Sequence, residues 1–345
     1  MIWAPFSSDR AADRLTRIAS LRRANWWNGL EVLFWLLPIA GYFAFPDRLP
    51  LLTAIATLGL FALSLDLVLG YAGIVSLGHA AFFGIGAYTV GVLATNGIGE
   101  PIAGLVVAAV AAAVSGFVTS FLVLRGRDLT RLMVTLGVAM MLLELANQLR
   151  SLTGGADGIQ GMKIDPVLGY FGFGLYGRTA YVYTLVILFI LFIVARRLVA
   201  SPFGLSLRAA KSNRLRMGAI GAPVNRRLIV IYTIGAAYAG VAGALLAETT
   251  QYVSLDVLNF NRSAEVLLVL IIGGAGRLYG ALIGAIVYEA MYDWLSGITQ
   301  QYWTFWLGLA LVVLMLFAQN GILGFAATAR DALRRGLASE AGAVR

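Results

Sequence analysis

The sequence contains no cysteine and only one histidine, His79. The lack of cysteine excludes disulfides and thiolate metal sites, and a single histidine cannot form a multi-histidine zinc site or a Cys–His catalytic pair. The two lysines, Lys163 and Lys211, follow methionine and alanine, so no Gly-Lys-Ser/Thr phosphate loop is present. A Gly-x-Ser-x-Gly elbow is also missing. We therefore expect no catalytic residues, no metal and no cofactor in this chain, and no ATPase activity of its own.

Charge is scarce as well. Only 12% of the 345 residues are charged, against about 25% in globular proteins, while 60% are hydrophobic and the mean hydropathy is +0.83. A soluble fold of this size cannot bury so much apolar surface, so lipid must solvate much of it. The net charge of +9 raises the possibility of nucleic-acid binding. The basic residues follow membrane sidedness instead, and no nucleic-acid-binding motif accompanies them.

Apolar runs of the length of a membrane span recur along the chain. They predict an all-α polytopic membrane protein with about ten transmembrane or half-membrane helices, which we place at 30–45, 49–69, 80–95, 102–124, 132–149, 179–199, 228–247, 264–275, 281–295 and 302–318. The third, eighth and ninth runs are short for full spans. Broken or half helices, with glycine-rich breaks, are expected there.

Arginine and lysine predict the orientation of these segments through the positive-inside rule. With a cytoplasmic N-terminus and ten crossings, all but five of the 26 basic residues fall on the cytoplasmic side, in 1–29, 70–79, 125–131, 196–227, 276–280 and 319–345. Residues 1–29 are expected to be a cytoplasmic arm, either a surface helix or a disordered tail, and not a signal peptide. Residues 30–318 form the membrane domain and 319–345 a cytoplasmic tail, while the glycine-rich loop 150–178 faces outward.

The stretch 70–88 is unusual for a lipid-facing helix because five of its nineteen residues are glycine. Glycine weakens a helix, but at membrane depth it allows close backbone approach or a break that lines a polar path. We therefore place the translocation pathway, as a hypothesis, at the following residues: Gly70, Gly73, Ser76, Gly78, His79, Gly273 and Gly274. A lone intramembrane histidine more commonly bridges helices by hydrogen bonds, and this alternative stays open for His79.

The segment 196–227 carries eight basic residues and no acidic residue. Ser201 and Pro202 are typical of a helix start, and Gly218, Gly221 and Pro223 of its end. Apolar residues that can bury one face lie between them: Leu205, Leu207, Ala209, Leu215, Met217 and Ile220. Two interpretations remain, a coupling helix that docks in a groove of a soluble partner, or a surface loop held by anionic lipid.

Several motifs together resemble one family. Gly-Tyr-Ala-Gly-Ile-Val-Ser-Leu-Gly-His at 70–79 is similar to the signature of LivM-type permease subunits of branched-chain amino acid ABC importers. Val134–Gly137, Leu152–Ile159, Ile272–Gly280 and Asn320–Gly324 resemble further family elements, in order and at family-like spacings. The likeness covers about residues 55–325. Two residues differ from the family pattern: Asp66 stands where the family tends to have asparagine, and Gln319 where it tends to have proline.

The resemblance also bears on the basic loop. Its residues Ser201, Pro202, Gly204, Arg208, Asn213, Gly218 and Gly221 match the loop by which such permeases contact their ATPase, and we assign the coupling role to them. Family members usually have acidic residues beside the asparagine, whereas this chain has Ser212 and Arg214. We therefore expect an ATPase with an acidic groove.

The resemblance implies a subunit that is not an enzyme and that forms half of a translocation pathway in the inner (plasma) membrane of a bacterium. It implies four kinds of partner besides membrane lipid: a LivH-type second permease, two ATP-binding cassette subunits that bind the ATP, a periplasmic substrate-binding protein at the outward loops, and the transported solute. The solute is a branched-chain amino acid or a related small polar molecule. Urea, amides and carboxylic acids are alternatives, because selectivity resides largely in the binding protein.

Two other classes of function remain to be compared. An ion-coupled secondary carrier would work alone and use Asp66, Glu144 and His79 with the broken helices. Glu289 and Asp293 also lie in an apolar run, nearer its end. A membrane scaffold without transport activity gains nothing from costly intramembrane carboxylates, which disfavours it.

Overall fold

The computed structural model describes residues 29–126, 128–174 and 177–298, together with 302, 305–306, 308–309, 312 and 321–324. The predicted N-terminal arm, most of the tenth apolar run and nearly all of the predicted C-terminal tail lie outside these residues. The chain divides into two compact units between Pro46 and Asp47. The first unit contains α2 (Gly29–Ala44), a short apolar helix with a proline inside it.

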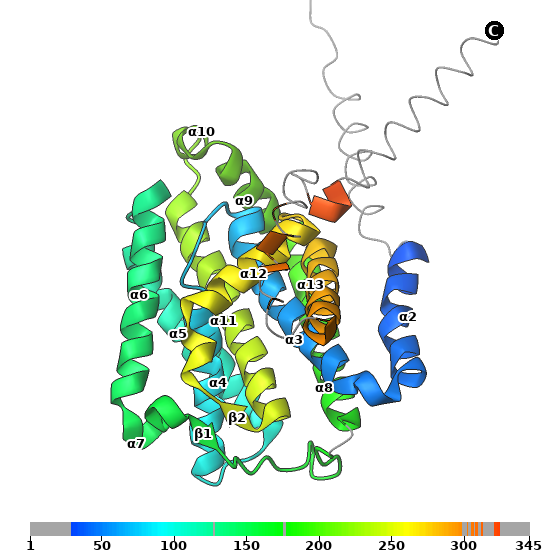
Figure 1. The fold of residues 1–345 in the computed structure, drawn as a ribbon. Helices are drawn as coiled ribbons and strands as arrows, with labels where there is room; N and C mark the ends of the chain where they lie inside the picture. Colours follow the sequence, from blue (N-terminus) through cyan, green and yellow to red (C-terminus); the bar gives the residue numbers. More distant parts are fainter. Residues whose placement is uncertain are drawn as a thin grey trace, which may run out of the picture. The chain divides into compact units, whose positions relative to one another are not determined.

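The second unit is almost entirely helical (Figure 1). After the short turn η1 (Pro46–Arg48), its elements are α3 (Leu49–Leu65), a π-helical turn η2 (Asp66–Tyr71), α4 (Ala80–Thr95), α5 (Pro101–Val123), α6 (Asp128–Gln148), α7 (Arg150–Thr153), η3 (Gly155–Asp157), β1 (Ile159–Gln160), α8 (Arg178–Ala200), α9 (Pro202–Ser212), α10 (Arg214–Ala219), α11 (Val224–Thr250), β2 (Tyr252–Val253), η4 (Leu255–Leu258), α12 (Phe260–Gly273) and α13 (Leu278–Ile298). Nine of the ten predicted apolar segments correspond to α2, α3, α4, α5, α6, α8, α11, α12 and α13, so the prediction of an all-α polytopic membrane protein is confirmed.

Five helical segments of the described chain are long and apolar enough to cross a membrane: Pro46–Tyr71, Pro101–Val123, Leu129–Gln148, Arg178–Ala200 and Val224–Thr250. A bent pair, α12 and α13, raises this number to six if it is counted as one span. Burial separates the five segments into two groups. The most apolar windows of Pro46–Tyr71 and Val224–Thr250 are 78% and 72% buried, whereas those of the other three are 17–28% buried. The first group therefore forms the centre of the bundle, and the second presents broad apolar faces outward.

Helix α11 lies at the centre and packs against α3, α4 and α5. Glycine makes this packing possible, because there is no room for a side chain at the helix crossings. A Cβ atom on Gly243 would collide with the carbonyl oxygen of Phe83 in α4, and one on Gly86 with the carbonyl of Gly240. Small residues at helix interfaces are the usual means by which membrane helices approach closely.

The connecting segments gather at two ends of this unit. Helices α9 and α10 and the turn between α12 and α13 lie at the upper end in Figure 1, and α7 and the two strands lie at the lower end. At the lower end β1 pairs with β2 in antiparallel fashion, Ile159 opposite Val253, and the N–H of Asp165 donates to the carbonyl of Gly99. The segments predicted to share a side of the membrane thus lie together at one end.

Candidate functional site

The first part of the site is the π-helical turn that ends α3. Gly70 has no room for a Cβ atom, which would collide with the carboxylate of Asp66 and lie 2.5 Å from the backbone nitrogen of Gly276. Asp66 is fully buried, and its Oδ1 accepts a hydrogen bond of 2.6 Å from the N–H of Gly276. π-helical turns are rare and are frequently found at functional sites. This turn joins the end of α3 to the turn between α12 and α13.

An irregular stretch, residues 72–79, follows the π turn and leads into α4. Side chains from other elements satisfy its backbone. The N–H of Leu77 donates to Thr135 Oγ1 in α6 at 3.2 Å, and the N–H of Ala80 donates to Ser263 Oγ in α12 at 2.9 Å. Non-helical backbone at membrane depth is tolerated only where the protein satisfies it in this manner or where it lines water. The break predicted in the glycine-rich stretch is therefore present.

His79 is fully buried at the end of this stretch. Its Nε2 lies 2.8 Å from Ser64 Oγ in α3, and its ring stacks on Phe61 at 5.8 Å and meets the edge of Phe82. The side chain bridges α3 and the start of α4, which is the structural alternative expected from the sequence. Ser76 and Gly78 are buried too, and a Cβ atom on Gly78 would collide with the carbonyl of Thr135. Their role in the pathway stays a prediction.

The second break follows Gly273 and separates α12 from α13, which meet at 112°. Gly274 has a φ of +102°, a conformation that favours glycine. The predicted break at Gly273–Gly274 is therefore present, although backbone covers both residues. A Cβ atom on Gly273 would collide with the carbonyl of Gly280, and one on Gly321 with the N–H of Gly274.

In the sequence Gly276, Gly280 and Gly284 are spaced four residues apart, a pattern that predicts one smooth helix face. The structure shows that this prediction is wrong for Gly276, which lies in the turn before α13 with a φ of +84°. The prediction failed because the spacing alone does not show that Gly276 lies in a turn and not in a helix. The other two glycines do pack against α12, since a Cβ atom on Gly284 would collide with the carbonyl of Val269.

The basic loop folds into two short helices rather than the single helix expected from its glycines. Ser201 caps α9 by accepting from the N–H of Gly204 at 3.4 Å, with Pro202 in the first turn, as predicted. Asn213 is extended and its side chain accepts from the N–H of Arg216 at 2.9 Å, so it ends α9 and caps α10. The asparagine side chain therefore restarts the helix, which the apolar pattern alone did not reveal.

The expected burial of one apolar face of this loop is correct only in part. Leu207 in α9 is buried, whereas Leu215 and Ile220, in and just after α10, are 86% and 73% exposed. Gly218 has open space around it, and Gly221 has a φ of +78° in the turn before α11. The surface of α10 thus presents apolar and basic side chains together.

Helix α9 docks on the π turn. The Lys211 ammonium donates to the carbonyl of Gly70 at 2.7 Å, and its stem lies against Gly73, where a Cβ atom would be 3.0 Å from Lys211 Cγ. The Arg208 guanidinium lies 5.2 Å from the centre of the Tyr71 ring. The glycine-rich stretch 70–79 and the basic loop 196–227, which carry most of the predicted pathway residues and all the predicted coupling residues, therefore contact each other. Lys211 makes this contact and was not among the predicted site residues.

Comparison with known proteins agrees with this architecture. The family model described as "Branched-chain amino acid transport system / permease component" matches residues 48–318. The chain belongs to this family. It is 29% identical over 294 residues to the high-affinity branched-chain amino acid transport system permease protein LivM of Escherichia coli, a match that covers 76% of this chain and 67% of the relative. It is 27% identical over 264 residues to a probable LivM of Methanocaldococcus jannaschii, covering 66% and 75% of the two chains. No solved structure matches.

A cavity of about 630 Å³ lies beside α10 of this permease. Four arginines from the α5–α6 turn, α6, α10 and α11 contribute to its wall: Arg125, Arg131, Arg214 and Arg226. Its lining residues include no carboxylate, and Arg131 is held in place by donating to the carbonyls of Val123 and Gly126. This end of the permease is suited to an acidic surface.

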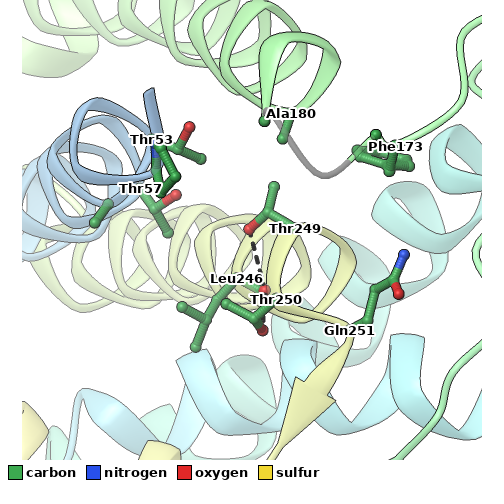
Figure 2. Close-up of a pocket in the computed structure, with 12 residues that line it drawn as sticks. Thr53, Thr57, Phe173, Ala180, Leu246, Thr249, Thr250 and Gln251 are labelled. Carbon is green, nitrogen blue, oxygen red and sulfur yellow. Dashed lines mark hydrogen bonds between the residues drawn. The ribbon is translucent and has the colours of Figure 1, made fainter. Parts of the chain in front are cut away.

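A second cavity, of about 340 Å³, opens at the C-terminal end of α11 (Figure 2). Thr53 and Thr57 of α3, Ala180 of α8 and Thr249 of α11 point toward it, and Phe173 lies at its edge. Its wall contains both threonine and apolar residues, which suits a small solute with both polar and apolar parts.

The carboxylates that an ion-coupled carrier would use do not form one cluster. Glu144 is exposed on α6 and accepts from the Gln148 amide at 3.0 Å, while Asp293 is exposed and pairs with Arg48 at 2.8 Å. Glu289 is half-buried and interacts with Arg262.

Sequence reasoning missed a fully buried carboxylate, Glu248 on α11. It lies beside Gly104 of α5 and interacts with Tyr183 of α8. The predicted apolar segment ended at residue 247 and so placed this residue in a loop, whereas the helix continues to Thr250.

Proposed function

We propose that this permease forms half of the translocation pathway of an ABC importer for branched-chain amino acids or related small polar solutes. Separate ATPase subunits would energise it, a second LivH-type permease would complete the pathway, and a periplasmic binding protein would deliver the solute. The observation that carries the proposal is the docking of the basic helix pair α9–α10 on the π turn of the glycine-rich signature, in a chain of this family.

The proposed mechanism is alternating access. ATP binding closes the ATPase pair, α9 and α10 move with it, and α9 passes the motion to the end of α3. Helix α11 runs on from this region through the centre of the bundle, and its 27 residues span about 40 Å. Coupling requires that the two conformations differ in their affinity for nucleotide and for the loaded binding protein.

The orientation follows from charge. The end with α9, α10 and the α5–α6 turn carries the arginine-lined cavity, so the positive-inside rule assigns it to the cytoplasm of a bacterial inner membrane. The threonine-lined cavity and the β1–β2 pair would then face the periplasm. Loop 150–178 is suited to meeting the binding protein there, since it is longer than a simple connection.

Transport driven by ATP is the test of this proposal. The affinity-purified assembly, reconstituted in liposomes with ATP inside the lumen and the binding protein outside, is expected to take up leucine, isoleucine or valine. Uptake is expected to persist with a protonophore and to stop with a non-hydrolysable ATP analogue. Uptake that depends on a proton or sodium gradient and ignores ATP would refute the ABC proposal in favour of an ion-coupled carrier.

The observed contacts favour the ABC proposal over the carrier. His79 bridges two helices and Asp66 binds the turn before α13, so both have structural partners. Urea, amide and carboxylic-acid solutes remain the alternatives within the ABC proposal. The same liposomes with each solute class would distinguish among them.

A further inference from the structure

The carbonyl of Gly70 lies where α3 and its π turn end. Helix C-termini leave carbonyl groups without a partner in their own helix. The N–H groups of Gly73 and Ile74, which follow the turn, donate to the carbonyls of Leu69 and Val68 and not to the carbonyl of Gly70. The Gly70 carbonyl instead accepts from Lys211 of α9, 141 residues away in sequence, at 2.7 Å. A cation at this position also complements the negative end of the helix dipole.

The same turn is connected to a third element through Asp66. This fully buried carboxylate accepts from the N–H of Gly276, and Gly70 lies against the same nitrogen. Within the described residues its second oxygen, Oδ2, has no hydrogen-bond partner, and the ammonium of Lys211 is close enough to interact with the carboxylate electrostatically. A buried carboxylate requires such compensation.

We infer that Lys211 and Asp66 form a charged strut that fixes the orientation of α9 against both helix breaks. Lys211 is a positioning residue: through Gly70 and Asp66 it connects the proposed coupling helix to the turn between α12 and α13. The role of the strut in coupling ATP hydrolysis to transport rests on the proposed function. The contact between α9 and the two helix breaks does not, because it lies within this chain. Arg208 also faces this region, but over the Tyr71 ring, and does not replace the contact to Gly70.

The absence of cysteine makes the connection measurable. A Ser212→Cys, Arg277→Cys pair places two spin labels at exposed positions, one on α9 and one in the turn before α13, with no other thiol in the chain. In the assembled transporter, Lys211→Met is expected to broaden the distribution of distances between the labels about twofold or more. Arg197→Met, which removes an exposed cation from the end of α8, just before α9, is the matched control and is expected to leave the distribution unchanged.

Transport gives the second readout. Lys211→Met is expected to lower solute uptake per ATP hydrolysed about tenfold, the size of effect that loss of one charge-assisted hydrogen bond supports. The assembly and its ATP hydrolysis without binding protein should be retained. Asp66→Asn combined with Lys211→Met is expected to be no worse than Lys211→Met alone, because residues in one network are not additive.

An unchanged distance distribution in Lys211→Met overturns the strut. Unchanged uptake per ATP with a broadened distribution overturns the role of the strut in coupling. If the chain instead purifies without an ATPase, the proposed function fails, and the distance measurement on the isolated chain still decides whether Lys211 fixes α9.

Discussion

Replacing Gly243 by alanine is expected to lower the free energy of unfolding of this permease by about 3 kcal/mol. The added methyl group would collide with the carbonyl oxygen of Phe83 and lie 3.0 Å from the nitrogen of Ala87, so α4 and α11 would have to separate. Backbone atoms cannot rotate away as a flexible side chain can. The expected result is a melting temperature several degrees lower in detergent, with a lower yield of folded protein.

Gly137→Ala is the matched control. Gly137 also lies within a helix, α6, and apart from its chain neighbours and the adjacent backbone of α6 no atom lies within 4 Å of the position of a Cβ. Both substitutions gain the same helix propensity, about 0.5–1 kcal/mol, and they differ only in packing. Gly137→Ala is therefore expected to melt at or slightly above the temperature of the parent protein. If the two variants have the same melting temperature, α4 and α11 do not pack closely at Gly243.

Reversing the charge of Arg214 and Arg216 together is expected to separate the permease from its ATPase. Both residues belong to α10, beside the exposed Leu215, and Arg214 also lines the basic cavity. A partner whose groove is acidic would meet two like charges in place of two unlike ones, and such contacts cost several kcal/mol. The ATPase recovered with the double Arg→Glu variant is expected to fall at least about tenfold in a pull-down at physiological salt.

The control for this variant makes the same change of charge at the other end of the molecule. Lys163→Glu with Arg178→Glu alters two exposed basic residues on the side that we assign to the periplasm. ATPase recovery should equal that of the parent protein. Equal recovery with the Arg214 and Arg216 reversals would show that α10 does not dock on an acidic surface.

Local signals in the sequence predicted the helices well because each signal acts over a few residues. The apolar runs correspond to the helices within a few residues, and Ser201 and Pro202 start α9 as expected. The pair Gly273–Gly274 ends α12 as expected, since an adjacent pair of glycines breaks a helix on its own. Asn213 is the exception, because only its side-chain contact shows that it starts a new helix.

Such local signals could not predict the long-range contacts that organise the site. Lys211 meets Gly70 across 141 residues and Gly276 meets Asp66 across 210, and neither pair has a periodic pattern. The sequence marked Asp66 as a costly intramembrane carboxylate but did not indicate what it contacts. Its partners are a backbone N–H in a distant turn and a lysine from the basic loop. The contact between the glycine-rich stretch 70–79 and the basic loop 196–227, two segments predicted separately, was visible only in the folded chain.

We propose that this permease works as one subunit of an ATP-driven assembly. The most direct measurement is gentle-detergent purification of the tagged chain from its own cells, followed by mass spectrometry of the proteins that accompany it. We expect a second permease to be recovered together with P-loop ATPase subunits in comparable amounts. A chain that purifies alone and still catalyses gradient-driven uptake in liposomes would show that it does not work as a subunit of an ATP-driven assembly.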